Sequence, residues 1–406
     1  MTKVLFFSPG FPLEMNHFAR GLKTVGAQVI GLGDTPVPAL PEMARESLAD
    51  YVQVRNLFDE SRVLEQVLDY ARKVRIDRVE CLWEPGMLLA ARLREALGVP
   101  GMTVAETIPF RDKEEMKKAL DRAGIRTPHH RRCRSAEEVR EAAAAIGFPV
   151  CVKPIAGAGS ADTYRVDDEK ELERVVILTQ HVAELSVEEF IEGEEFTFDT
   201  ICTEGKIRYW NVAWYRPRPL IARTQEWISP QTVTLRNVAD PRIRPGIEMG
   251  QRVLEALNFR TGFTHMEWFL KPNGEAVFGE IGGRPPGARS VDIMNFGSDL
   301  DVYVGWAEAA VHGSFSQNIE RKYNAAVIFK RAHGTGRIRR IEGLEEIVRE
   351  FGNWITCIDL LPIGAHRRNW KQTLISDGYL MLRHPDLQTC LYMADKVGSH
   401  LQIYAG

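Results

Sequence analysis

Residues 262–287 read GFTHMEWFLKPNGEAVFGEIGGRPPG, and this stretch predicts a β-hairpin. Two alternating apolar runs, at 265–270 and 275–281, flank Asn273 and Gly274. An Asn-Gly pair between such runs is the strongest short-range hairpin signal, because a type I′ turn needs positive φ at both central residues. We therefore expect two antiparallel strands joined by a two-residue turn.

Counting outward from this turn gives the register of the two strands. Pro272 faces Glu275, and Glu267 lies directly opposite Glu280. Side chains paired in this way have Cβ atoms about 5 Å apart, where like charges destabilise a sheet. A divalent cation held between the two carboxylates would offset this repulsion. The hairpin therefore predicts a metal site at Glu267 and Glu280; the alternative is a pair of ordinary exposed glutamates.

Composition limits the classes of protein to consider. A chain of 406 residues is too long for one ordinary core, so we expect about two to four domains. A net charge of −3 gives no electrostatic reason to expect nucleic acid or an anionic membrane as a partner. The six cysteines are scattered and form no CxxC motif, which favours a reducing cytoplasm.

The first part of the chain, residues 1–106, alternates short apolar strands with helical patterns. This alternation predicts an open parallel α/β sheet covered on both faces. The loops at 8–11 and 83–86 follow two of its strands and are either substrate loops or ordinary turns. No GxGxxG motif follows the first strand, which disfavours a dinucleotide-binding fold.

Three further units are predicted by changes in pattern. Residues 107–185 indicate a small α+β unit, residues 186–320 a larger antiparallel one, and residues 321–406 a C-terminal α+β module. One continuous helix is expected at 299–312. The chain is thus predicted to be multidomain, with α/β and α+β parts.

A candidate phosphate-binding loop follows the strand that ends at Lys153. Gly157 and Gly159 can let backbone N–H groups converge on phosphate oxygens, and Ser160 adds a hydroxyl donor. Taken alone, such a loop is more often a plain hairpin turn. The neighbouring motifs and their order support the phosphate-binding interpretation, since Lys113 begins a capped helix about forty residues upstream.

Five segments, in this order and spacing, resemble the ATP-grasp superfamily of carboxylate–amine ligases over about residues 107–312. The segments are RDK at 111–113, CVKPIAGAGS at 151–160, EEFIEGEEF at 188–196, HMEWF at 265–269 and GEIGGRPPG at 279–287. The Gly-x-x-His-x-Glu form at 262–267 and the C-terminal segment are most similar to the L-amino-acid ligases, which join two amino acids into a dipeptide. The resemblance implies an ATP-grasp fold of two α+β subdomains after an N-terminal α/β domain.

The resemblance implies that Lys113 and Lys153 contact the phosphates of ATP. Gly157, Gly159 and Ser160 would belong to a loop that closes over those phosphates.

The acidic segment at 188–195 would then bind the nucleoside. The resemblance implies hydrogen bonds to adenine from the Glu188 side chain and from the backbone of Glu189 and Ile191, with Phe190 between them. Glu195 would hold the ribose hydroxyls. The alternative for these glutamates is a solvated acidic turn.

The hairpin residues would carry the chemistry. Glu267 and Glu280 would bind Mg²⁺ (or Mn²⁺), although Gly282 stands where the family commonly has a ligand Asn. Arg284 would stabilise an acyl phosphate or the tetrahedral state after it, unless it forms a salt bridge to a nearby glutamate. His265 would orient substrate or a metal-bound water, or make a structural hydrogen bond.

The resemblance implies that ATP phosphorylates a carboxylate and that an amine then displaces phosphate to form an amide. Small-molecule carboxylates and amines are the expected partners, and a homodimer is compatible because such ligases are often dimers. The alternatives are a carboxylase-type enzyme that activates bicarbonate and a non-catalytic ATP-binding protein. Residues 214–227, rich in arginine and aromatic residues, could line a substrate pocket or form an exposed strand.

Overall fold

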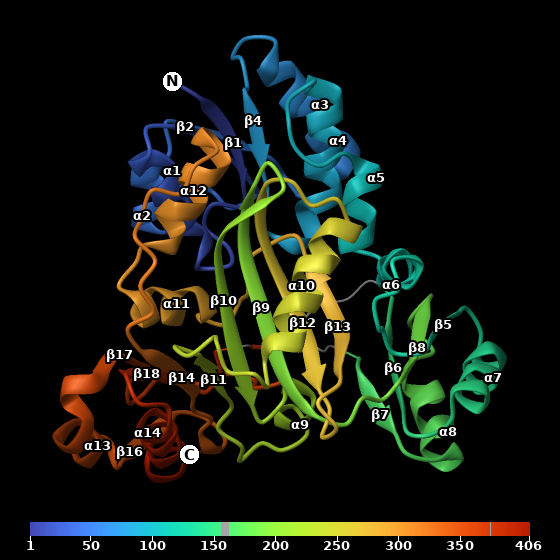
Figure 1. The fold of residues 1–406 in the computed structure, drawn as a ribbon. Helices are drawn as coiled ribbons and strands as arrows, with labels where there is room; N and C mark the ends of the chain where they lie inside the picture. Colours follow the sequence, from blue (N-terminus) through green and yellow to red (C-terminus); the bar gives the residue numbers. More distant parts are fainter. Residues whose placement is uncertain (156–161, 374) are drawn as a thin grey trace.

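The computed structural model describes residues 1–155, 162–373 and 375–406. Figure 1 shows a long antiparallel sheet at the centre, with the N-terminal unit at one end. A small α+β unit and the C-terminal part of the chain lie on opposite sides of its other end. In these described ranges no helix has the length and apolarity needed to cross a membrane.

The N-terminal unit is a four-stranded parallel sheet, as the alternating pattern predicts. Its strands, in spatial order, are β3 (Asp50–Gln53), β2 (Gln28–Gly33), β1 (Lys3–Phe7) and β4 (Arg78–Glu80). Its helices are α1 (Met15–Thr24), α2 (Glu42–Ser47), α3 (Glu60–Ala71), α4 (Met87–Leu97) and α5 (Val104–Thr107), with 3₁₀ turns η1 (Val37–Ala39), η2 (Glu84–Gly86) and η3 (Ile108–Phe110). Alternate residues of β1 enter different cores, Phe6 on one face and Phe7 on the other. Both faces of the sheet are therefore covered.

One predicted helix is wrong in its bounds. Residues 299–312 do not form one helix, because Asp299 takes a left-handed φ of 49° and ends α11 (Ser290–Ser298). The Asp301 side chain then accepts a hydrogen bond from the Val304 N–H and begins α12 (Val302–His312). Helix α12 packs on α1 of the N-terminal sheet, where Trp306 is fully buried.

The small unit is a four-stranded antiparallel sheet. Its strands, in spatial order, are β5 (His130–Cys133), β8 (Leu185–Glu189), β6 (Val150–Pro154) and β7 (Tyr164–Val166). Helices α7 (Ala136–Ile146) and α8 (Glu169–Leu178) share its core. Helix α6 (Lys113–Arg122) begins at Asp112, whose side chain accepts from the backbone N–H groups of Glu114 and Glu115, as the capping pattern predicts.

The central sheet has eight strands and runs past the predicted boundary at 320. Its strands, in spatial order, are β13 (Ala276–Gly282), β12 (Gly262–Leu270), β9 (Glu194–Thr203), β10 (Lys206–Arg216), β11 (Gln231–Thr234), β14 (Asn324–Phe329), β18 (Gly378–His384) and β17 (Ile355–Leu360). A small sheet of β15 (His333–Gly334), β19 (Gln402–Ala405) and β16 (Ile338–Glu342) lies beside it. The remaining helices are α9 (Pro219–Ala222), α10 (Arg244–Ala256), α13 (Leu344–Phe351), η4 (Gly352–Trp354) and α14 (Leu387–His400). The division into four domains remains a prediction, and β14, β17 and β18 extend the same sheet as β9–β12.

The hairpin predicted at residues 262–287 is present, but its turn differs from the prediction. The Gly274 N–H donates to the Lys271 carbonyl, and Lys271 rather than Pro272 pairs with Glu275. Of the turn residues, Gly274 has a positive φ and Asn273 does not, so the turn is not type I′. A bulge between Glu267 and Trp268 shifts the register back by one residue. Glu267 therefore pairs with Glu280, as predicted.

Candidate active site

One pocket collects every predicted site residue that the structure describes. It lies between the four-stranded sheet of the small unit (β5, β8, β6 and β7), α6 and the end of the hairpin. The predicted residues among its lining are Lys113, Lys153, Glu188, Glu189, Phe190, Ile191, Glu195, His265, Glu267, Glu280 and Arg284. Gly157, Gly159 and Ser160 lie outside the described residues.

The two hairpin carboxylates face the same pocket. Glu280 forms an ion pair with Lys113, whose Nζ lies 3.4 Å from its Oε1. Burial alone would raise the pKa of Glu267, but the hydrogen bond from His265 and the charge of Arg284 lower it. Glu267 also accepts a hydrogen bond from the Tyr215 hydroxyl at 3.2 Å. Both carboxylates are thus held close to cations.

His265 connects Glu267 to a buried aspartate that the sequence did not indicate. Its Nδ1 lies 2.6 Å from Oδ1 of Asp199 on β9, and its Nε2 lies 3.4 Å from Glu267 Oε1. Burial would lower the pKa of His265, but Asp199 and then Glu267 outweigh burial and raise it to about 9. The imidazole is therefore protonated at neutral pH and orients Glu267.

The carboxylates of Glu267 and Glu280 fit a hard cation that takes its remaining ligands from water and from a bound substrate. Among the described residues no group of three or more His, Cys, Asp or Glu side chains gathers as a self-sufficient metal site. Mg²⁺ commonly uses one or two carboxylates and completes its shell with water and substrate phosphates. Glu267 and Glu280 suit that arrangement.

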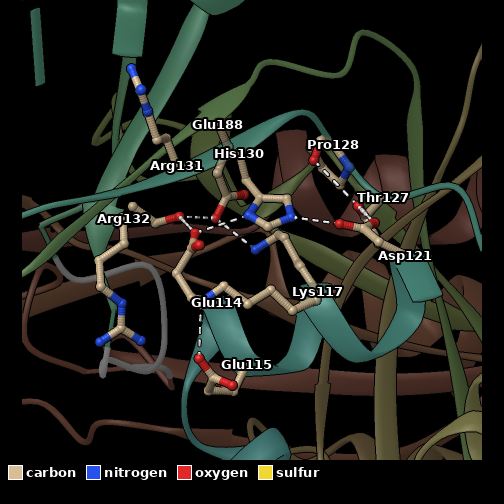
Figure 2. Close-up of polar contacts among 12 residues, drawn as sticks. Glu114, Glu115, Lys117, Asp121, Thr127, Pro128, His130, Arg131, Arg132 and Glu188 are labelled. Carbon is tan, nitrogen blue, oxygen red and sulfur yellow. Dashed lines mark hydrogen bonds and ion pairs between the residues drawn. The ribbon is translucent and has the colours of Figure 1, made fainter. Parts of the chain in front are cut away.

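Glu188 lies at the other end of the pocket between two lysines. Its Oε1 is 2.7 Å from Nζ of Lys117, and its Oε2 is 2.9 Å from Nζ of Lys153 (the contact with Lys117 is shown in Figure 2). Burial would raise the pKa of Glu188, but these two charges hold it well below its usual range. The carboxylate is therefore ionised, and Lys117 is a site neighbour that the motifs did not identify.

Some backbone N–H and carbonyl groups after Glu188 already make hydrogen bonds within the protein, and others are available to a ligand. The Glu189 N–H already donates to the His129 carbonyl at 2.7 Å, so a backbone contact of Glu189 with a ligand would use its carbonyl. In the described part of the chain the Ile191 N–H makes no hydrogen bond, while the Ile191 carbonyl accepts from Arg218 at 2.7 Å. The Ile191 N–H is thus a donor at the pocket wall.

Arg218 contacts both Glu195 and two aromatic rings, Phe190 and Phe269, that line the pocket. Its guanidinium lies between the rings of Phe190 and Phe269, 4.7 and 4.6 Å from their centroids, and its Nε is 3.3 Å from Glu195 Oε2. Burial and the nearby charge of Glu267 raise the pKa of Glu195 to about 8. Arg218 belongs to the 214–227 stretch, which therefore supplies part of the pocket.

Arg284 forms a salt bridge to a nearby glutamate, which was the predicted alternative to a role in stabilising the acyl phosphate. Its Nε and Nη2 lie 2.9 and 2.7 Å from Oε2 of Glu84. Glu84 also pairs with Arg111 and stands in the 83–86 loop after β4. This loop therefore approaches the hairpin end of the pocket.

Comparisons with known proteins relate part of the chain to a known domain and most of it to named ligases. The family model of the ATP-grasp domain matches residues 110–213. An L-arginine-specific L-amino acid ligase of Bacillus subtilis is 25% identical over 244 residues, which cover 58% of this chain and 58% of that protein. The alanine–anticapsin ligase of Bacillus subtilis is 25% identical over 311 residues, which cover 65% of each chain. The chain thus matches between 58% and 65% of the length of these two relatives.

Solved structures show the same fold over the whole chain. The L-amino acid ligase from Bacillus licheniformis has a TM-score of 0.80 at 20% identity, covering 100% of this chain and 99% of that chain. The N5-carboxyaminoimidazole ribonucleotide synthetase from Thermotoga maritima has a TM-score of 0.74 at 19% identity and full coverage of both chains (100% each). Residues 110–213 thus match the ATP-grasp domain, and the whole chain shares its fold with these two solved structures.

Proposed function

We propose that the protein is an ATP-dependent carboxylate–amine ligase that joins amino acids through an acyl phosphate and releases ADP and phosphate. The observation that carries the proposal is the charge arrangement of one pocket. Two lysines, Lys113 and Lys153, and two paired carboxylates, Glu267 and Glu280, line it together. A triphosphate with its divalent cation needs both kinds of group.

The nucleotide is expected to lie across the pocket from β6 and β8 of the small unit to the hairpin. Lys113 and Lys153 would bind the phosphates, and Glu267 and Glu280 would hold Mg²⁺. Bound there, the metal would neutralise charge on the phosphates during phosphoryl transfer. Glu195 would accept from the ribose hydroxyls.

The adenine end is expected to use the backbone beyond Glu188. The Ile191 N–H would donate to a ring nitrogen, and the Glu189 carbonyl would accept from the amino group. The Phe190 ring, already in contact with Arg165 and Arg218, would pack against the base.

Arg284 would act on the reacting carboxylate. Its guanidinium faces the pocket that Glu267 and Glu280 also line, and it is held by Glu84. A fixed guanidinium stabilises the charge that develops when an amine attacks an acyl phosphate. The names of the relatives, an L-amino acid ligase and an alanine–anticapsin ligase, support amino acids as the substrates.

The proposal is tested by measuring ADP release against pairs of amino acids. Release that requires both a carboxylate and an amine supports ligation, and the dipeptide should be found by mass spectrometry. Release that requires bicarbonate instead would identify a carboxylase-type enzyme. Binding of ATP without turnover on any pair would identify a non-catalytic ATP-binding protein.

Glu280→Gln tests, in the same assay, whether Glu267 and Glu280 hold a metal ion. We expect turnover to fall by about a hundredfold or more, because a lost carboxylate ligand removes several kcal/mol of charge stabilisation. Glu275→Gln is the matched control, since Glu275 lies next to β13 and pairs with Lys271 and Arg126. Full activity of Glu280→Gln would refute the role given to the pair.

A further inference from the structure

Lys117 is a lysine with no exposed surface, one turn along α6 from Lys113. Lysines are almost never fully buried unless they are paired. Figure 2 shows its side chain extending from α6 to Glu188, where Nζ ends 2.7 Å from Oε1. Lys117 does not belong to the pocket lining, whereas Lys153, on the other carboxylate oxygen, does. Glu188 is thus shared by one lysine behind the pocket wall and one in the pocket.

We propose that Lys117 is a positioning residue for nucleotide binding. It serves as the permanent counter-ion of Glu188, so that Lys153 can leave Glu188 and contact a phosphate. The inference rests on the proposed function and refines the part that Lys153 plays in it.

The charges around Glu188 explain why two lysines are needed. Glu188 itself is only 3% exposed. A carboxylate buried to this degree and left without a cation is strongly destabilising. With Lys117 in place, Lys153 can turn toward a phosphate while Glu188 keeps one ion pair. Without Lys117, the same movement of Lys153 would leave Glu188 uncompensated.

Neighbouring groups do not replace Lys117. Within the described residues, Lys117 and Lys153 are the cations within ion-pair distance of Glu188. The nearby His130 is engaged by other carboxylates, with Nδ1 3.0 Å from Glu114 and Nε2 3.0 Å from Asp121 (Figure 2). A hydroxyl group, that of Ser186, lies between Glu114 and Glu188 but carries no charge.

The test is Lys117→Met, which keeps an unbranched side chain and removes the charge. ATP binding is measured by calorimetry, and KM for ATP and kcat by ADP release. We expect the Kd and KM for ATP to rise at least about tenfold, because Lys153 is retained by Glu188, while kcat changes less. Lys118→Met is the matched control: Lys118 is the next residue on α6, exposed and paired with Glu115.

A second variant separates this role from simple docking of α6. In Lys117→Met/Glu188→Gln no carboxylate retains Lys153, so the Kd for ATP should fall back toward that of Glu188→Gln alone. If Lys117 only holds α6 in place, Lys117→Met will lower Tm, leave the Kd of the folded protein unchanged, and gain nothing from Glu188→Gln. Those results would overturn the inference. A wild-type protein that binds no ATP would instead overturn the proposed function, so the two failures are distinct.

Discussion

Gly282→Asn should strengthen the proposed metal site, since the resemblance to ATP-grasp ligases implies a ligand Asn at this position. Gly282 ends β13, pairs with His265 across the hairpin, and lines the pocket. Residues two apart on a strand face the same side, so a side chain at 282 would share the face of Glu280. An Asn there would bring an amide oxygen to the two carboxylates.

The structure gives room for this side chain. A Cβ built on Gly282 would lie 3.4 Å from Cγ of Arg284, which is ordinary van der Waals contact. The φ of Gly282 lies outside the left-handed region, so a substitution causes no backbone strain there. An amide oxygen that contacts a charged partner, here the metal ion, contributes about 1.5–3 kcal/mol to binding. Ordering the side chain costs up to about 1 kcal/mol, which leaves about a tenfold gain in metal affinity.

The assay is a titration of the protein with Mn²⁺ in the presence of ADP, followed by electron paramagnetic resonance. Half-saturation of ADP release by Mg²⁺ is measured in parallel. Gly282→Ala is the control, because it adds the Cβ without the oxygen. Equal metal affinities for Gly282→Asn and Gly282→Ala would refute the view that position 282 faces the metal.

Two further predictions concern pH and packing. Asp199→Asn should lower the pKa of His265 from about 9 toward the ordinary 6.5, which ring NMR can follow. Because the folded pKa is raised, the stabilisation from this pair is complete below about pH 6.5 and is lost as the pH rises through about 9. The Tm of the wild type should therefore fall more steeply than that of Asp199→Asn between pH 7 and about 9.5, and parallel slopes would contradict this. Gly246→Ala should lower Tm, because its Cβ would lie 2.2 Å from the buried Trp268 ring and such overpacking costs about 1–3 kcal/mol. Gly352→Ala, with no atom within 4 Å of its Cβ, is the control and should leave Tm unchanged.

Local sequence patterns predict the single helices and strands of this fold better than they predict how the strands assemble into sheets. The strand at Lys3–Phe7 and the hairpin of β9 and β10 follow directly from apolar periodicity and turn residues. The break at Asp299 was missed because a left-handed residue between two apolar helices leaves the periodicity almost unchanged. The continuation of the central sheet into the C-terminal part was also missed. It depends on β14 pairing with β11 about ninety residues earlier, and such pairing has no local signal.

The same distinction holds at the site. Motif residues were identified because each occupies a fixed place relative to a strand end, turn or helix start. Their partners were not, because the contacts span 66 residues from Asp199 to His265, 71 from Lys117 to Glu188 and 200 from Glu84 to Arg284. Lys117 gave one usable signal: it lies between Met116 and Leu120 on the buried side of α6, where an unpaired lysine is not expected.

The pairing of Glu267 with Glu280 is correct although the turn that predicted it is not. The observed turn has three residues between Lys271 and Glu275, which by itself would move Glu280 out of register with Glu267. The bulge at Gly279 restores the pairing, and a Cβ there would lie 2.8 Å from the Glu267 carbonyl oxygen. Bulges of this kind re-aim side chains next to active sites. The register of Glu267 and Glu280 therefore depends on the bulge beside them as well as on the turn, so Gly279 contributes to the proposed metal site through its backbone.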